Sequence, residues 1–156
     1  MAKLQSDLKE FIALLNSRGA EYIVVGGHAV AFHGYPRFTG DIDFFLRATP
    51  DNAQRVLAVL KDFGFGELQI TVSDLTAPNR VIQLGRPPNR IDLLTSISGV
   101  EFDDAWSSRV STDLDGEHVS FLGLNELIQN KKASNREKDR ADVSKLLAVA
   151  SCKGAG

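Results

Sequence analysis

The stretch VVGGHAVAFHGYPRFTGDIDFF, residues 24–45, decides both the predicted fold and the predicted site. It leads from the end of an apolar strand through two glycines and a short apolar segment into a second strand with Asp41 and Asp43. Side chains two residues apart on a strand share a face, so both carboxylates project together while Ile42 points into the core. Two like charges this close need either solvent or a cation between them.

A third acid lies further along the chain in another apolar run. Asp92 is part of RIDLLT, residues 90–95, where an isolated charge would be costly to bury. We predict that its strand lies beside the strand of Asp41 and Asp43, which would bring three carboxylates together. Mg²⁺ and Mn²⁺ prefer such oxygen ligands, commonly one or two carboxylates with substrate phosphates. Asp92 could also accept the proton of an attacking hydroxyl.

The glycine pair suits a phosphate. Gly26 and Gly27 would let the backbone approach an anion closely, and the following short helix offers free N–H groups at its start. Each feature also has an ordinary explanation, since Gly-Gly is often only a turn and Asp-x-Asp often faces solvent. We expect His28 and His33, on the short apolar helix, to be packed structural side chains. The three acids and the glycines in this order are more specific than any one of them.

Hydrophobic spacing predicts an α/β fold: a mixed sheet with helices on one side and a helical C-terminal portion. Strands are predicted at 21–25, 41–46, 79–85 and 89–95, and the turn Asp115-Gly116 predicts a hairpin within 111–122. A first helix should be stopped by Gly19, and Thr49 should cap a helix that begins with Pro50. Further helices are predicted at 26–34, 99–106 and, as a pair, after 124.

Composition excludes several classes of protein. The 156 residues suggest one domain, and 43% hydrophobic with 24% charged residues is ordinary for a globular chain. The formal net charge of -2 gives no global reason for nucleic-acid or acidic-membrane binding. The single cysteine, Cys152, rules out an internal disulfide and zinc sites of several thiolates. We see no membrane span and no signal peptide, so we expect a cytoplasmic protein without a membrane partner.

The glycines and acids resemble the signature of the DNA polymerase beta-like nucleotidyltransferase superfamily. Val25, Gly26 and Gly27 precede the run 41–44, read as Asp-Ile-Asp-Phe, and Asp92 matches the later strand acid. Within the superfamily the chain is similar to the small bacterial minimal and abortive-infection-toxin-like groups. Two stretches carry that similarity: His33, Gly34, Arg37 and Thr39 before the acids, and ELIQNKKASNREKDRADVSKLL near the C-terminus.

The resemblance implies a nucleotidyltransferase fold that moves a nucleoside monophosphate from a nucleoside triphosphate to a hydroxyl acceptor, with Mg²⁺ or Mn²⁺ as cofactor. Asp41, Asp43 and Asp92 would be the metal ligands and catalytic acids. The implied nucleotide-binding residues are Gly26, Gly27, Arg37, Thr39, Lys131 and Arg136.

The basic residues keep a second interpretation. Lys131 and Arg136 could instead form ion pairs on a solvated helix face, and Asp139 is expected to cap or pair structurally. Arg37 could contact phosphate or neutralise the Asp pair. The implied organisation is a nucleotidyltransferase core at 1–123, C-terminal helices at 124–150 packed on it in one compact domain, and a flexible tail at 151–156.

The acceptor stays open among tRNA, a protein and a small molecule such as an aminoglycoside. A second hypothesis is a toxin–antitoxin or phage-defence component that mainly binds a nucleotide or a cognate partner. A third is a phosphodiester hydrolase that uses the same acids.

Overall fold

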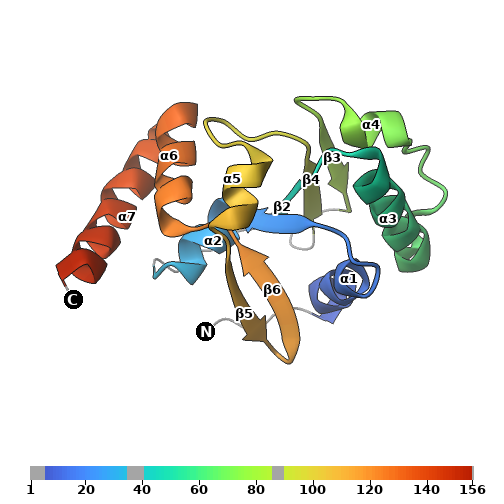
Figure 1. Cartoon of the computed structure of the whole chain (residues 1–156), viewed down its shortest axis with the longest axis horizontal. Coiled ribbons are helices and arrows are strands. Elements are labelled where there is room, and N and C mark those ends of the chain that lie inside the picture. The colour runs from blue at the N-terminus through green and yellow to red at the C-terminus, as the bar shows by residue number, and fades with distance from the viewer. Residues whose placement is uncertain (1–5, 35–40, 86–89, 156) are drawn as a thin grey trace.

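In this computed structural model the described residues are 6–34, 41–85 and 90–155, and their strands form one six-stranded sheet in the middle of the molecule. Figure 1 shows α6 and α7 at one end and α3 with α4 at the other. The strands are β1 (Tyr22–Val25), β2 (Asp41–Leu46), β3 (Val81–Leu84), β4 (Arg90–Leu94), β5 (Val110–Leu114) and β6 (Glu117–Phe121). The helices are α1 (Ser6–Ser17), α2 (Gly26–Phe32), α3 (Pro50–Leu60), the π-helical turn η1 (Lys61–Phe65), α4 (Val72–Thr76), α5 (Phe102–Ser107), α6 (Leu124–Ser134) and α7 (Glu137–Ala155).

The sheet has the order β3-β4-β2-β1-β6-β5 and is mixed, which confirms the predicted α/β class. β2 runs parallel to β4, and β1 runs parallel to β6, while the other neighbours are antiparallel. The predicted pairing of the two acid-bearing strands is also confirmed. Asp41 is the register partner of Arg90, and Asp43 is the register partner of Asp92.

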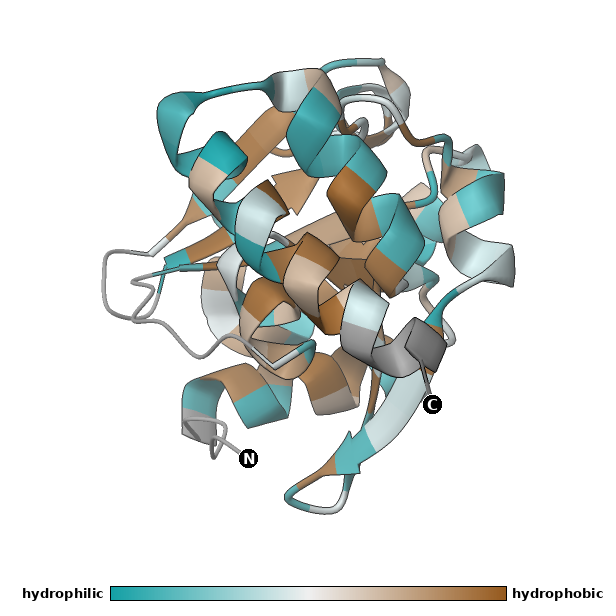
Figure 2. Cartoon of the chain, turned by 90° about the vertical axis from the view of Figure 1, so that its left-hand side faces the viewer, coloured by the Kyte–Doolittle hydropathy of each residue, from teal (hydrophilic) through white to brown (hydrophobic). Residues whose placement is uncertain are grey.

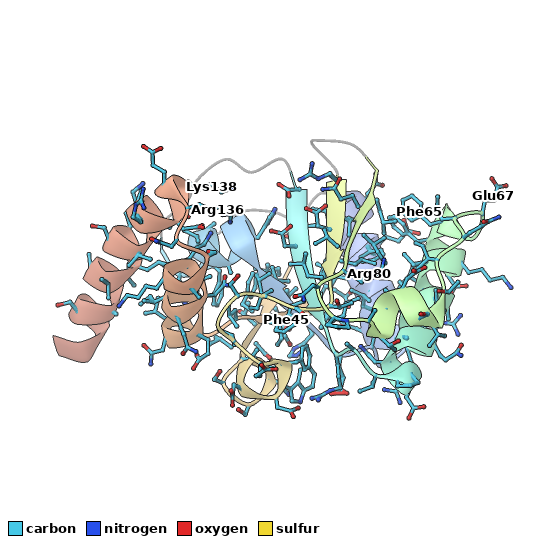
Figure 3. All side chains as sticks on the ribbon, turned by 90° about the horizontal axis from the view of Figure 1, so that it is seen from above. Phe45, Phe65, Glu67, Arg80, Arg136 and Lys138 are labelled. Carbon is cyan, nitrogen blue, oxygen red and sulfur yellow. The ribbon has the colours of Figure 1, made fainter. Side chains whose placement is uncertain are left out.

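Helices cover both faces of the sheet, so the expectation of helices on one side was wrong. Phe44 of β2 contacts Phe11 of α1, with ring centroids 5.4 Å apart. Phe45 points to the opposite face, where its ring lies 5.1 Å from that of Phe102 in α5 (Figure 3). The apolar run at 44–46 explains this, because a strand without alternation is buried on both faces.

Local signals in the sequence act as predicted. Thr49 accepts a hydrogen bond from the backbone N–H of Asn52 at the start of α3. Asp115 and Gly116 both have positive φ, 52° and 83°, in the turn between β5 and β6, as a tight hairpin requires. Gly19 has φ of 69° just after α1. These positions fix where elements end, and so which residues reach the middle of the sheet.

The C-terminal helices α6 and α7 pack against each other, and Asn135 connects them in the left-handed conformation. Leu127 and Ile128 of α6 and Leu146 of α7 are buried in the core, and Figure 2 shows that these helices also carry hydrophilic residues. α7 continues through Ala155, so most of the segment 151–156 predicted as a tail is helical. The run Leu147–Lys153 has no proline, and the single Gly154 costs a helix only about 1 kcal/mol. Within the described ranges we find no helix both long and apolar enough to cross a membrane.

Candidate active site

Three carboxylates meet on one face of the sheet, where β2 and β4 run side by side. Each of Asp41, Asp43 and Asp92 offers an oxygen within 4.8 Å of the other two. Asp41 and Asp43 are half-buried, whereas Asp92 is only 6% exposed. Ile42, between the first two, is buried in the core on the opposite face. Alternation along β2 and the parallel register with β4 together produce this acid cluster.

Arg90 is bound to the acid cluster. Its Nη2 donates to Asp41 Oδ2 at 2.9 Å and to Asp92 Oδ2 at 3.3 Å. Its Nε lies 3.2 Å from Asp92 Oδ1. The guanidinium thus spans two of the three carboxylates, and its side chain stays 31% exposed.

The acid cluster disfavours three ionised carboxylates. Burial raises the pKa of Asp43 to about 7, helped by its hydrogen bond with Asp92 and by the charge of Asp41. The pKa of Asp92 is also raised, first by burial and then by the hydrogen bond with Asp41, although Arg90 opposes the change. Nearby like charges and poor solvation both favour the neutral acid. A cation of higher charge among these oxygens would reverse that preference.

Gly26 makes room for the acid cluster. It begins α2 with φ of 68°, a conformation that L side chains rarely adopt. A Cβ at this position would overlap the Asp43 carboxylate. The glycine pair predicted to approach a phosphate therefore lies directly beside the predicted metal ligands, and Gly27 is buried behind it.

The structure places Lys131 in a buried ion pair between α6 and α7. Lys131 Nζ lies 3.2 Å from Asp139 Oδ1 and 3.3 Å from Asp142 Oδ2, and these three side chains are at most 4% exposed. Asp139 also accepts hydrogen bonds from Ser134 Oγ at 2.8 Å and Arg136 Nε at 2.7 Å. The expected structural role of Asp139 is confirmed. A nucleotide contact by Lys131 stays a prediction, and it would require this network to open.

Arg136 lies between α6 and α7 and is paired with Asp139. Its side chain is 61% exposed, and its hydrogen bond to Asp139 is the main cause of its raised pKa, to which the charge of Asp43 also contributes. Figure 3 shows Arg136 at the start of α7, on the side toward the sheet. The remaining predicted nucleotide ligands, Arg37 and Thr39, lie outside the described residues.

The two histidines differ in burial. His33 is buried, with Nε2 2.7 Å from the carbonyl oxygen of Leu122, which confirms a structural side chain. His28 is half-buried, and burial lowers its pKa while the nearby Asp41 charge opposes this.

Sequence reasoning missed two residues beside the acid cluster. Arg90 is the first residue of β4, two positions before Asp92, and the pattern Arg-x-Asp on a strand could have placed it on the same face. Gln83, exposed on the edge strand β3, is the register partner of Asp92. No signal in the sequence marked Gln83, because its position depends on the register between β3 and β4.

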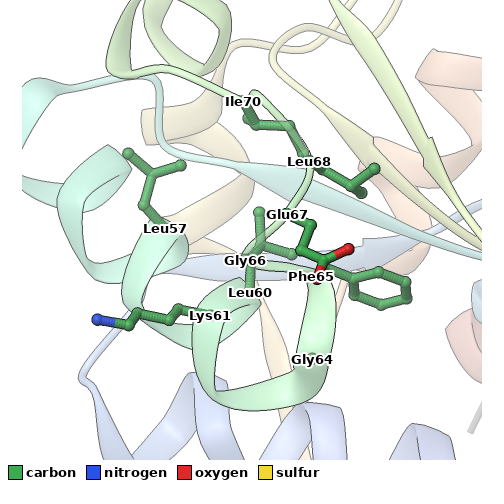
Figure 4. A pocket seen from close by; sticks show the side chains of 9 residues that line it. All are labelled: Leu57, Leu60, Lys61, Gly64, Phe65, Gly66, Glu67, Leu68 and Ile70. Carbon is green, nitrogen blue, oxygen red and sulfur yellow. The ribbon is translucent and has the colours of Figure 1, made fainter.

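A separate groove lies at the far end of the molecule from Arg136. It has a volume of about 540 Å³ and lies between α3, η1 and the segment after η1 (Figure 4). Its lining is mostly apolar, and none of its residues belongs to the acid cluster or the predicted nucleotide ligands. The lining residues are Leu57, Leu60, Lys61, Gly64, Phe65, Gly66, Glu67, Leu68 and Ile70.

The acids fit a divalent cation. Three carboxylate oxygens lie within 4.8 Å of one another, burial and neighbouring acids raise the pKa of Asp43 to about 7, and Gly26 has no side chain that would fill the space beside Asp43. Oxygen-only donor sets of this kind suit Mg²⁺ and Mn²⁺.

A mixed sheet with paired aspartates after a Gly-Gly turn and a third on the neighbouring parallel strand defines the nucleotidyltransferase class of fold. The chain belongs to the family described as Nucleotidyltransferase of unknown function (DUF6036), whose model matches residues 2–153. This agrees with the superfamily resemblance and supports nucleotidyl transfer as the class of activity. A search of curated protein sequences finds no match.

Solved structures share the fold. The lincosamide antibiotic adenylyltransferase LnuA, with lincomycin bound, is 16% identical with a TM-score of 0.61, over 96% of this chain and 99% of that one. A candidate nucleotidyltransferase of Thermotoga maritima is 15% identical with a TM-score of 0.60, over 90% of each chain. An antigenic nucleotidyltransferase-like protein of Paracoccidioides brasiliensis is 17% identical with a TM-score of 0.55, over 95% of this chain and 78% of that one.

Proposed function

We propose that this protein is a metal-dependent nucleotidyltransferase that moves a nucleoside monophosphate from a nucleoside triphosphate to a hydroxyl acceptor. The observation that carries the proposal is the acid cluster, in which Asp41, Asp43 and Asp92 converge beside the Gly26 backbone. Family membership supports the same class of reaction.

The proposed reaction is an in-line displacement at phosphorus. The acceptor oxygen attacks the α-phosphorus, the bond from that phosphorus to the bridging oxygen of the β-phosphate breaks, and pyrophosphate leaves. Mg²⁺ or Mn²⁺ held by the three acids would offset the charge of the triphosphate and polarise the reacting phosphoryl group.

The residues of this chain have separate roles in the proposal. Asp92, the most buried of the three acids, accepts the proton of the attacking hydroxyl. The backbone at Gly26 and Gly27 approaches the triphosphate, and Arg136, just before α7, is a further proposed ligand of it. Arg37 and Thr39, which lead into β2, are further proposed nucleotide ligands.

The acceptor proposed for a first test is a small hydroxylated molecule. LnuA binds lincomycin, and the alignment with this chain covers 99% of its length, so a chain of this size needs no added domain for such an acceptor. tRNA and proteins, including a cognate toxin or antitoxin partner, are the other proposed acceptors or partners, and an assay with each class separates them.

The test combines binding and turnover. Thermal unfolding is measured with each of the four nucleoside triphosphates, with and without Mg²⁺, on wild type, Asp43→Asn and Asp113→Asn. Asp113 lies exposed on β5, so its variant matches the charge change outside the site. We expect stabilisation by one nucleotide that requires Mg²⁺ and is lost only in Asp43→Asn.

Turnover is followed as pyrophosphate release and as transfer of label from an α-³²P nucleotide to the acceptor. We expect Asp43→Asn to lower it by about a thousandfold. Release of free monophosphate without transfer to any acceptor would instead indicate a phosphodiester hydrolase. Absence of any nucleotide-dependent stabilisation in folded wild type would contradict the proposal.

A further inference from the structure

Arg90 binds two of the three carboxylates that would hold a metal ion. Both oxygens of Asp92 and one oxygen of Asp41 have an Arg90 nitrogen within 3.3 Å. A divalent cation needs lone pairs on these carboxylates, and its charge repels a guanidinium nearby. Arg90 and a cation therefore compete for the acid cluster.

The position of Arg90 makes the contact persistent but reversible. Arg90 is the register partner of Asp41 and lies two residues from Asp92, so the sheet holds the three side chains on one face. Its side chain is 31% exposed and belongs to the first residue of β4. A long side chain with a solvent-exposed part can leave these carboxylates without opening the core.

A triphosphate would offer Arg90 another partner. The planar guanidinium binds two oxygens of a phosphate as well as it binds a carboxylate, and both bonds are charge-assisted. Nucleotide bound beside Gly26 would bring such oxygens next to the acid cluster, because Gly26 packs against Asp43.

We propose that Arg90 is an exchangeable counter-ion of the acid cluster. It lowers the affinity of the three acids for a divalent cation alone, and it moves to triphosphate oxygens when cation and nucleotide enter together. The second half rests on the function proposed above. Cation and nucleotide then raise each other's affinity, because each removes a cost that the other would meet alone.

The competition is tested by titration with Mn²⁺ alone, with free Mn²⁺ followed by its paramagnetic resonance signal at pH 8. The variants are Arg90→Gln, Arg90→Lys and the control Arg80→Gln. Arg80 directly precedes Val81, which pairs with Leu94 at the end of β4 opposite to Arg90, so the control makes the same charge change away from the acid cluster. We expect Arg90→Gln to tighten Mn²⁺ binding by about tenfold, Arg90→Lys to tighten it less, and Arg80→Gln to match wild type.

Two further measurements keep the result interpretable. Circular dichroism melts show that each variant is folded, and Asp92→Asn, which removes a shared acceptor, should lose Mn²⁺ binding and so identify the site. Mn²⁺ binding by folded Arg90→Gln that is equal to or weaker than wild type would overturn the competition. Mn²⁺ binding that Asp92→Asn leaves intact would overturn it too.

The nucleotide half is tested by repeating the titration with a non-hydrolysable nucleoside triphosphate analogue. In wild type the analogue should tighten Mn²⁺ binding beyond the affinity of the free analogue for Mn²⁺, and Arg90→Gln should reduce this enhancement by about tenfold. An unchanged enhancement in Arg90→Gln would overturn the transfer to phosphate. If wild type shows no enhancement at all, the proposed function and the transfer both fail, whereas the competition is still decided by Mn²⁺ alone.

Discussion

The acid cluster on β2 and β4 and the ion-pair network between α6 and α7 both combine aspartates with basic side chains. They differ in how many basic partners the aspartates have. In the network, Asp139 and Asp142 both contact Lys131. Asp139 also accepts hydrogen bonds from Arg136 and Ser134. In the acid cluster, Arg90 forms ion pairs with two of the three carboxylates, those of Asp41 and Asp92.

The pKa of the central acid shows the consequence. Despite its burial, Asp139 has a pKa well below the usual range, because Arg136, Ser134 and Lys131 donate to it. Burial and neighbouring acids raise the pKa of Asp43 to about 7. The charges of the network therefore balance within the protein, whereas the acid cluster could accept further positive charge. Buried charge is informative about ligands when its partners do not balance it.

Loss of the network cation should have the largest effect on stability. Lys131→Met leaves Asp139 and Asp142 buried without their shared ammonium, and we expect the free energy of unfolding to fall by about 3–5 kcal/mol. Lys132→Met is the matched control, because Lys132 is the exposed neighbour on α6. Urea unfolding monitored by circular dichroism measures both. Similar values for the two variants would contradict a structural role for Lys131.

Gly26→Ala should lower both the stability of the protein and the Mn²⁺ affinity of the acid cluster, and backbone strain alone would lower only the stability. The added Cβ would meet the Asp43 carboxylate at a residue with φ of 68°. We expect a loss of about 2–3 kcal/mol in unfolding free energy, together with weaker Mn²⁺ binding. Gly19→Ala is the control, with φ of 69° and open space around its Cβ, and should lose only about 1 kcal/mol without any change in Mn²⁺ binding. Equal losses and unchanged Mn²⁺ binding would show that Gly26 serves only the backbone.

The two regions should give pH dependence of opposite sign. The folded-state pKa of Asp43 lies above its unfolded value, so the native state binds the extra proton and loses stability as pH rises from about 4 to about 7. Asp43→Asn removes that loss and should gain on the order of 1–2 kcal/mol relative to wild type between pH 5 and pH 8, with chelator present. The pKa of Asp139 is lowered, so its contribution is complete above its unfolded value and is lost as pH falls below about 4.

Guanidinium unfolding at pH 3, 5 and 8 measures both trends, with Asp139→Asn as the second variant. The difference in unfolding free energy between wild type and Asp139→Asn should be smaller at pH 3 than at pH 8. The difference between wild type and Asp43→Asn should instead be small at pH 3, where Asp43 is protonated in both the folded and the unfolded state, and larger at pH 8. Parallel pH profiles for the two variants would mean that the regions do not differ in charge balance.

The sequence predicted the part of the site that depends on alternation within strands. The spacing of Asp41 and Asp43 fixes their common face, and the apolar surroundings of Asp92 indicated a buried strand next to them. Gly26, one of the two glycines predicted to approach a phosphate, lies against Asp43, and its contact with a phosphate stays a prediction. The helix α4 was not predicted, although Thr71 and Asp74 form a capping box there.

What could not be predicted depends on contacts between distant segments. Whether Lys131 faces a nucleotide or two acids is decided by how α6 packs on α7, and helical spacing permits both. The cover on the second face of the sheet depends on α5, whose Phe102 lies far from Phe45 in sequence. The spacing of Arg90 and Asp92 could have placed both on one face of their strand. The contact between Arg90 and Asp41 could not be predicted, because it depends on the register between β2 and β4.

Removal of Arg136, an exposed member of the ion-pair network, should have the smallest effect on stability. Its side chain is 61% exposed, and Asp139 would keep Lys131 and Ser134 as partners, so Arg136→Gln should lower the unfolding free energy by less than about 1 kcal/mol. The charge of Asp43 contributes to the raised pKa of Arg136, however, so a triphosphate beside Asp43 would lose the attraction of this guanidinium in the variant. We expect nucleotide affinity to fall about three- to tenfold in a fluorescent-nucleotide titration, while the exposed α7 variant Arg140→Gln stays within twofold of wild type. A large loss of stability with unchanged nucleotide affinity would assign Arg136 to the network alone.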